Sequence, residues 1–145
     1  MTVIRTSPGH LTIALLGRGP NGIVDPEEVR KVNDAIQADK GAQLTDIVSV
    51  VSAAPEFYDI VVNAIIPPGP SIHDVKAAIE SELRKEADHL ATIGGEVRTS
   101  ALIAAGRVKP ITKFSLVEPT RHLIPAAHGV MIARNITANV EMGID

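Results

Sequence analysis

The chain of 145 residues contains no cysteine and no tryptophan, and aromatic residues make up only 2% of it. The missing thiols exclude disulfides, thiolate metal sites and cysteine nucleophiles. With only Phe57, Tyr58 and Phe114, the chain has no platform on which nucleic acid bases stack. We therefore expect no nucleic acid partner. The formal net charge of -3 agrees, because proteins that bind a phosphate backbone are usually basic.

Long hydrophobic runs are missing as well. No apolar run reaches the ~18 residues that a membrane span requires. The N-terminal segment MTVIRTSPGH lacks the apolar centre of a signal peptide. We therefore expect no membrane partner and synthesis in a cytoplasm. Hydrophobic residues still make up 45% of the chain, which is enough for one compact domain with a real core.

Short apolar segments with strand-like alternation recur along the chain. We expect strands at residues 10–17, 46–52, 56–66, 111–117 and 133–142. In the third of these, Tyr58, Ile60 and Val62 share an apolar face, while Phe57 and Asp59 begin a mixed face. This alternation is typical of a sheet with one buried and one open face.

Three segments have helical signals. Asp25 predicts the start of a first helix that Gly41 can end, and Ser71 with Asp74 predicts a long second helix. The long helix has an apolar stripe and an opposite charged side that we expect to be solvated. Thr99 or Ser100 is expected to cap a short third helix, residues 99–106.

The order of these elements predicts the fold class. We expect an α+β protein with a ferredoxin-like split βαβ sandwich. Its sheet would be mixed and mostly antiparallel, with helices on one face and an extra C-terminal strand. We expect residues 1–9 to be an N-terminal extension and residues 10–145 to be a single domain.

The segment GRGPNG, residues 17–22, matches the dinucleotide-binding pattern G-x-G-x-x-G. A true fingerprint begins its helix inside the glycine run, so that free amides face the pyrophosphate. Here Asp25 caps the helix three residues after Gly22, and Pro20 removes one amide donor. We interpret the segment as a turn between a strand and a helix and expect no cofactor.

The histidines do not form a metal-ligand pattern. His73 and His89 lie at opposite ends of the long helix, and the nearest carboxylate in sequence to His122 and His128 is Glu118. A catalytic zinc site needs three protein ligands in defined spacing. Ser100 lacks the G-x-S-x-G elbow of a hydrolase nucleophile. We therefore expect no metal, no catalytic residues and no enzyme, although a hydrolase that uses His122 or His128 stays an open alternative.

Apolar side chains outside the expected core suggest a contact surface. They lie on the mixed face of the third strand and in the segment from His122 to Ala133. Either the segment folds over its own core or it contacts another chain. The residues that we predict for an interface are Phe57, Val61, Ile65, Leu123, Ile124 and Met131.

Four segments in order carry a resemblance to a known family. They are SPGHLTIALLGRGPNG, LTDIVSVVSAAPEFYDIVVNAIIPPG, IGGEVRTSALIAAG and ITANVEM. The set resembles the C-terminal part of baseplate assembly J-type proteins, which are wedge components of contractile phage tails and tail-like particles. Members of that family usually carry further domains upstream.

The resemblance implies a non-enzymatic structural role with no catalytic residues to transfer. It implies contacts with other baseplate wedge proteins and with copies of the chain itself. It also implies a location in the virion baseplate after assembly in the host bacterial cytoplasm. A second hypothesis from the fold alone is a ferredoxin-like regulatory module that binds a small ligand through the GRGPNG loop.

Overall fold

The computed structural model describes residues 2–7, 10–19, 21–40 and 47–143. The described chain has three helices and mixed sheets, which confirms the predicted α+β class. It divides into two compact units. Unit 1 comprises Met1–Glu56, Thr92–Gly94 and Pro125–Val130, and unit 2 comprises Phe57–Ala91, Gly95–Ile124 and Met131–Asp145. The single domain expected over residues 10–145 stays a prediction.

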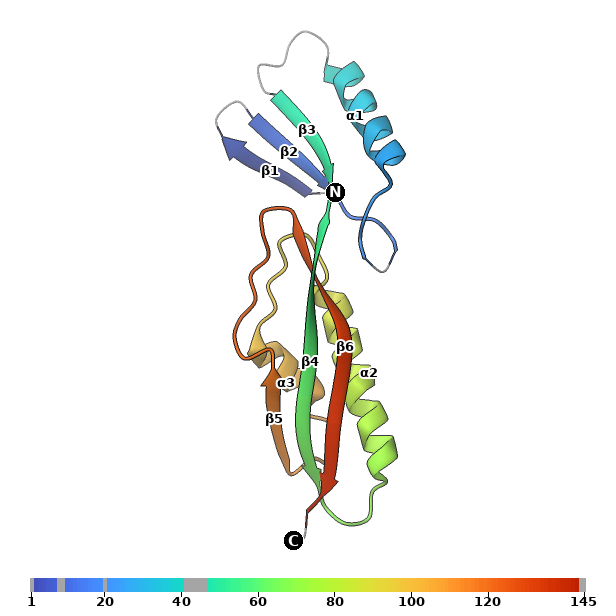
Figure 1. Ribbon diagram of the computed structural model, residues 1–145, viewed down its shortest axis with the longest axis vertical. Helices are drawn as coiled ribbons and strands as arrows, with labels where there is room; N and C mark the ends of the chain where they lie inside the picture. The colour runs from blue at the N-terminus through green and yellow to red at the C-terminus, as the bar shows by residue number, and fades with distance from the viewer. Residues whose placement is uncertain (1, 8–9, 20, 41–46, 144–145) are drawn as a thin grey trace. The chain divides into compact units, whose positions relative to one another are not determined.

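Unit 1 is built around a three-stranded sheet in the order β1-β2-β3. β1 (Thr2–Ser7) pairs antiparallel with β2 (His10–Leu15), and β2 pairs in parallel with β3 (Ile47–Ser52). Helix α1 (Pro26–Lys40) is the crossover between the two parallel strands (Figure 1). The predicted N-terminal extension, residues 1–9, thus contains a strand of the sheet. TVIRTS alternates too briefly to be separated from an irregular end by sequence alone.

Helix α1 begins at Pro26, as the sequence predicts, and Glu28 and Val29 donate backbone hydrogen bonds to the carbonyl oxygen of Asp25. Three predicted features lie outside the described residues. They are the end of this helix at Gly41, the start of the second expected strand at Asp46, and the motif LTD. Half-buried Val29 and the half-buried strand residues Val48 and Val50 show which face of the sheet α1 covers.

Unit 2 contains the other sheet, in the order β5-β4-β6. β4 (Ala54–Ile66) pairs antiparallel with β5 (Lys113–Glu118). β6 (Gly129–Met142) runs parallel to β4, because side chains of β4 contact β6 residues at a constant offset of 76 positions (Figure 1). The expected single ferredoxin-like sheet is therefore not confirmed. Strand partners are separated by many residues, and local periodicity does not identify them.

Helix α2 (Ile72–Leu90) begins at the predicted cap, where the Ser71 hydroxyl accepts a hydrogen bond from the Asp74 amide at 3.4 Å. Its stripe of Val75, Ile79 and Leu83 is buried with the even-numbered face of β4, including Ile60 and Val62, as the sequence predicts. The rest of this core cluster is formed by Tyr58, Ala64, Ile66, Ala87, Val97, Leu102, Met131, Ala133 and Ala138.

Helix α3 (Thr99–Gly106) occupies the predicted range, but its predicted cap is wrong. Arg98 is the N-cap residue, and no side chain caps the helix. The amides of Ala101 and Leu102 donate instead to the Arg98 carbonyl oxygen. Gly106 is the last helical residue, and it is buried. An added Cβ atom there would lie 2.6 Å from the Phe114 ring, so any larger residue would force its neighbours to shift.

Candidate functional site

The GRGPNG loop of unit 1 uses its own backbone donors, although Pro20 lies outside the described residues. The Gly17 amide donates to the Gly22 carbonyl oxygen at 2.7 Å, and the Gly22 amide donates to Gly19 at 3.1 Å. Gly22 has a φ of 69°, a conformation that favours glycine. Helix α1 starts only at Pro26. The amides of Gly17 and Gly22 are thus occupied within the loop and do not present a phosphate cradle.

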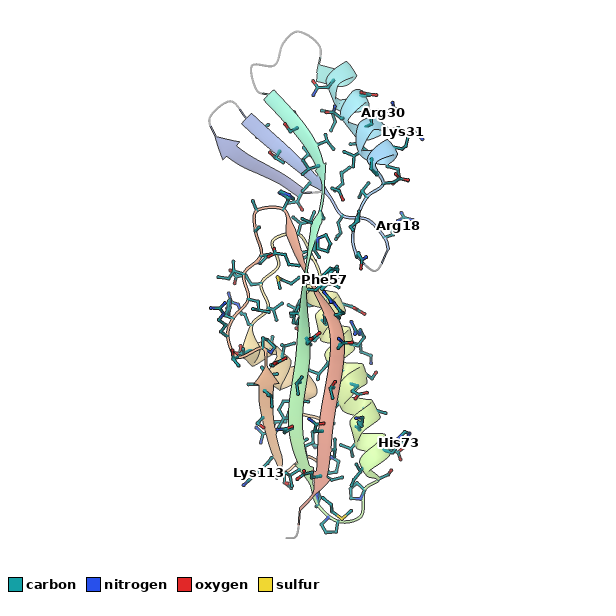
Figure 2. All side chains as sticks on the ribbon, viewed as in Figure 1. Arg18, Arg30, Lys31, Phe57, His73 and Lys113 are labelled. Carbon is teal, nitrogen blue, oxygen red and sulfur yellow. The ribbon has the colours of Figure 1, made fainter. Side chains whose placement is uncertain are left out.

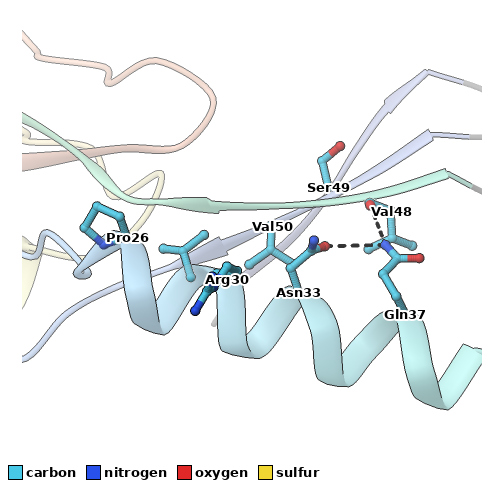
Figure 3. A pocket seen from close by; sticks show the side chains of 8 residues that line it. Pro26, Arg30, Asn33, Gln37, Val48, Ser49 and Val50 are labelled. Atoms are coloured by element: carbon cyan, nitrogen blue, oxygen red, sulfur yellow. Dashed lines mark hydrogen bonds between the residues drawn. The ribbon is translucent and has the colours of Figure 1, made fainter.

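A shallow groove of about 490 Å³ lies between α1 and β3 in the same unit (Figure 3). Gln37 donates from Nε2 to the Val48 carbonyl oxygen at 3.2 Å, while Ser49 points away from the helix. Pro26, Val29, Asn33 and further residues complete the lining. The groove contains one basic side chain, Arg30, which forms a salt bridge with Glu27 at 3.4 Å. Nothing in this arrangement indicates a reaction.

Among the histidines whose side chains the structure describes, His73 and His89 do not lie beside His122. His73 and His89 are exposed on α2. His122 contacts Glu96 with 3.1 Å between Nε2 and Oε2, so its carboxylate neighbour is Glu96 and not Glu118. This hydrogen bond holds the pKa of the Glu96 carboxyl below its usual range, with a further contribution from Arg98. No group of three or more possible metal ligands occurs among the residues that the structure describes.

One face of the unit 2 sheet packs against α2, and the side chains on the opposite face alternate between exposed and half-buried along β4. We call this opposite face the open face. On β4 the open face carries the odd-numbered residues, which alternate with the buried even-numbered ones. The polar residues among them, Asp59 and Asn63, form hydrogen bonds with residues of β6. Asn135 donates to Asp59 Oδ1 from both its backbone and side-chain nitrogens at 3.3 Å. Asn139 donates from Nδ2 to Asn63 Oδ1 at 3.1 Å. The residues of the open face are Phe57, Asp59, Val61, Asn63, Ile65, Lys113, Ser115, Val117, Arg134, Asn135, Asn139 and Glu141.

Phe57 is the aromatic residue of the open face, and its side chain is 43% exposed on β4 (Figure 2). The guanidinium carbon of Arg134 lies 4.4 Å from the centroid of the Phe57 ring. This cation–π contact holds the ring in place and leaves a partly exposed aromatic surface beside a positive charge. A hollow of about 530 Å³ lies farther along the face, and Asn63, Ile65 and Asn139 are among its lining residues.

The six predicted interface residues fall into three environments. Phe57, Val61 and Ile65 share the open face, where the last two are half-buried. Ile124 is 68% exposed. Leu123 is half-buried against the core, and Met131 is only 5% exposed within it. The segment after β5 thus partly folds over its own core, and Met131 is unavailable to a partner.

The exposed position of Ile124 is fixed by its neighbour. Leu123 exchanges two backbone hydrogen bonds of 2.9 Å with Val97 in an isolated antiparallel bridge. The His122–Glu96 contact flanks this bridge. The sequence does not identify Glu96 as a partner of His122, because the two residues are 26 positions apart. Nor does it identify Asn135 and Asn139 as partners of β4, although the alternation in ITANVEM places them on one side of their strand.

Three further findings bear on function. In the described part of the chain, every helix is too short or too polar to cross a membrane.

No protein-family profile matches the chain. The chain is, however, similar to a curated bacteriophage baseplate protein. That relative is Baseplate protein J of Escherichia phage P2, with 27% identity over 124 residues. The matched region covers 86% of the chain but 41% of the relative's length, and it confirms the resemblance found in the sequence.

Proposed function

We propose that the chain is a non-enzymatic structural component of a phage tail baseplate, of the wedge type, located in the virion baseplate after assembly in the bacterial cytoplasm. The observation that carries this proposal is the similarity to Baseplate protein J across 86% of the chain. Because the chain spans 41% of that relative's length, the proposal concerns the role of the matched region. It acts through protein–protein contacts with other wedge proteins and with copies of itself.

The surface proposed for these contacts consists of the open face and Ile124. It alternates apolar side chains such as Phe57 and Val61 with amides and charges. Such a mixture is typical of interfaces between subunits that also exist separately, in which aromatic residues and arginine are enriched. Phe57 and Ile124 are the anchors that we expect to bury most new area, because they are 43% and 68% exposed.

The alternative of a small-ligand regulatory module is less well supported. It requires the GRGPNG loop to offer backbone donors to a ligand. Gly17 and Gly22 donate within the loop instead. A hydrolase based on His122 is also less well supported, because its imidazole is 40% exposed and contacts Glu96 at 3.1 Å.

The proposal is tested by co-purification with the baseplate proteins encoded in the same phage or prophage genome. We expect wild type to form a complex of defined mass in size-exclusion chromatography with light scattering. The variant Phe57→Asp/Ile124→Asp should bind at least about tenfold more weakly, because truncating anchor residues removes most of the binding energy. The matched control is Ile103→Asp, which changes an apolar side chain that is 37% exposed on α3.

Circular dichroism establishes that each variant is folded before binding is compared. Complementation of a deletion strain provides the second measurement, with particle morphology read by electron microscopy. Wild type that binds none of the encoded baseplate proteins, and a deletion strain that assembles normal baseplates, would refute the proposed function. Equal loss in the variant and the control would refute the proposed surface alone.

A further inference from the structure

Strand β6 forms one edge of the unit 2 sheet, because the strand order is β5-β4-β6. An edge strand presents a row of unpaired backbone groups, and such a row is a template for pairing with another chain. The groups of β6 that point away from β4 include the Ala138 amide and the carbonyl oxygens of Ala133 and Ala138. Each of these groups is hydrogen-bonded in the structure, and each partner is a side chain of α2.

The three partner side chains are spaced four residues apart on the helix. Lys76 donates from Nζ to the Ala138 carbonyl oxygen at 3.1 Å, and Glu80 Oε1 accepts from the Ala138 amide at 3.3 Å. Arg84 donates from Nη1 to the Ala133 carbonyl oxygen at 2.9 Å. Residues four apart lie in one row along a helix, so a single row of charges follows the strand edge.

The small residues of β6 explain how these side chains reach the backbone. Ala133 and Ala138 are 5% and 0% exposed and belong to the core cluster beneath α2. A methyl side chain lets the helix approach the strand closely. The long side chains next to the apolar stripe of α2 then extend past it to the edge, with their aliphatic stems on apolar surface. Lys76 and Glu80 also pair with each other, with 3.6 Å between Nζ and Oε1.

We propose that Lys76, Glu80 and Arg84 form an edge guard that closes β6 to strand addition by a second copy of the chain. Hydrogen bonds with a charged partner are stronger than neutral ones, so an incoming strand must displace favourable bonds. A guard on β6 directs contacts to the open face instead of the edge. The inference depends on the contacts of α2 and β6 and not on the proposed baseplate role.

The test compares two double variants of the same helix. Lys76→Ala/Glu80→Ala removes two members of the guard. Glu82→Ala/Lys85→Ala is the matched control, because it also removes one acid and one base, which form a salt bridge with each other at 3.2 Å. Both variants keep the formal net charge and place alanine at two helical positions.

Two measurements on the full chain separate the variants. The Ala138 amide should exchange with solvent about tenfold faster or more in the guard variant, since it loses its acceptor. Sedimentation velocity over a concentration series should show a new dimer that neither wild type nor the control forms. In Glu80→Gln the side-chain oxygen can still accept, so exchange at Ala138 should stay close to that of wild type.

Every outcome decides the proposal. Faster exchange at Ala138 together with the new dimer supports it. Unchanged exchange, or faster exchange without any change in oligomeric state, overturns it. If the guard variant fails to fold, Glu80→Ala alone is compared with Glu80→Gln by the same two measurements. Equal behaviour of those two single variants then overturns the proposal.

Discussion

Replacing Tyr58 with phenylalanine removes a hydroxyl that the fold buries without a hydrogen bond. The Tyr58 side chain is 8% exposed and belongs to the core of unit 2. Its hydroxyl oxygen has no hydrogen-bond partner among the described residues. Burying an unsatisfied polar group costs about 1–3 kcal/mol, so Tyr58→Phe should raise the free energy of unfolding by roughly 1 kcal/mol at neutral pH. Most substitutions in a core have the opposite sign.

Because Tyr58 is buried, the difference in the free energy of unfolding between wild type and Tyr58→Phe also depends on pH. Desolvation raises the pKa of Tyr58 to about 12, outweighing the opposing effect of the nearby Arg84 charge. An unfolded tyrosine titrates near pH ~10. Below that pH the Tyr58 hydroxyl is protonated in both the folded and the unfolded state, so its ionisation does not change the stability. Between the two pKa values only the unfolded state loses its proton, so wild type loses stability, by roughly 3 kcal/mol at most.

The assay is urea unfolding followed by circular dichroism, for wild type and Tyr58→Phe, at several pH values from neutral to strongly alkaline. Lysine titration affects both proteins equally and cancels in the difference. The advantage of the phenylalanine variant should therefore grow as the pH rises through the interval between the two pKa values. The chain has one tyrosine and no tryptophan, so the near-ultraviolet absorbance of tyrosinate reports directly on Tyr58 in the folded protein.

Two results would refute this reasoning. One is a less stable Tyr58→Phe variant at neutral pH, which would mean that the hydroxyl has a stabilising partner. The other is an absorbance titration of the folded protein with a midpoint near pH ~10, the value of an exposed tyrosine. The first result would show that the hydroxyl is hydrogen-bonded, and the second that it is solvated.

Two further predictions concern packing in unit 2. Leu83 is 0% exposed in the core, so Leu83→Ala should lower the free energy of unfolding by about 2–5 kcal/mol in the same urea assay. A loss below about 1 kcal/mol would contradict the assigned packing of α2. Gly106→Ala should cost about 1–3 kcal/mol, because the added methyl would lie 2.6 Å from the Phe114 ring and 3.2 Å from Leu83. Gly19→Ala, whose methyl would meet nothing within 4 Å, is the control and should be nearly neutral.

The helix α2 and the strand β4 could be predicted in detail because their signals are local. Ser71 supplies its cap, and the spacing of Val75, Ile79 and Leu83 records which side meets the sheet. The alternation of β4 likewise separates buried Ile60 from partly exposed Phe57. In each case the pattern lies within one element and follows the geometry of that element.

The division into two sheets could not be predicted in this way. Only Ala53 separates β3 from β4, yet these strands belong to different sheets. The open face depends on a parallel pairing in which Asp59 meets Asn135, 76 residues away. Alternation shows that each strand has a polar side, but it does not show which strands are neighbours. The interface prediction therefore correctly groups Phe57, Val61 and Ile65 on one face of β4, but it wrongly includes Met131, which is buried.

The charged side of α2 shows why periodicity alone misassigns some polar residues. The sequence predicts a solvated face for Lys76, Glu80 and Arg84 because they lie off the apolar stripe. Each follows a buried stripe residue by one position, however, and so lies at the border of the helix face that packs on the sheet. A helix residue at this border can lie above an edge strand, and its side chain can then bond to backbone groups that have no neighbouring strand to pair with. This requires a small strand residue beneath the helix, such as Ala138. A row of charges beside an apolar stripe, paired with alanines on the last strand of the sheet, is therefore a sequence signal for a closed edge.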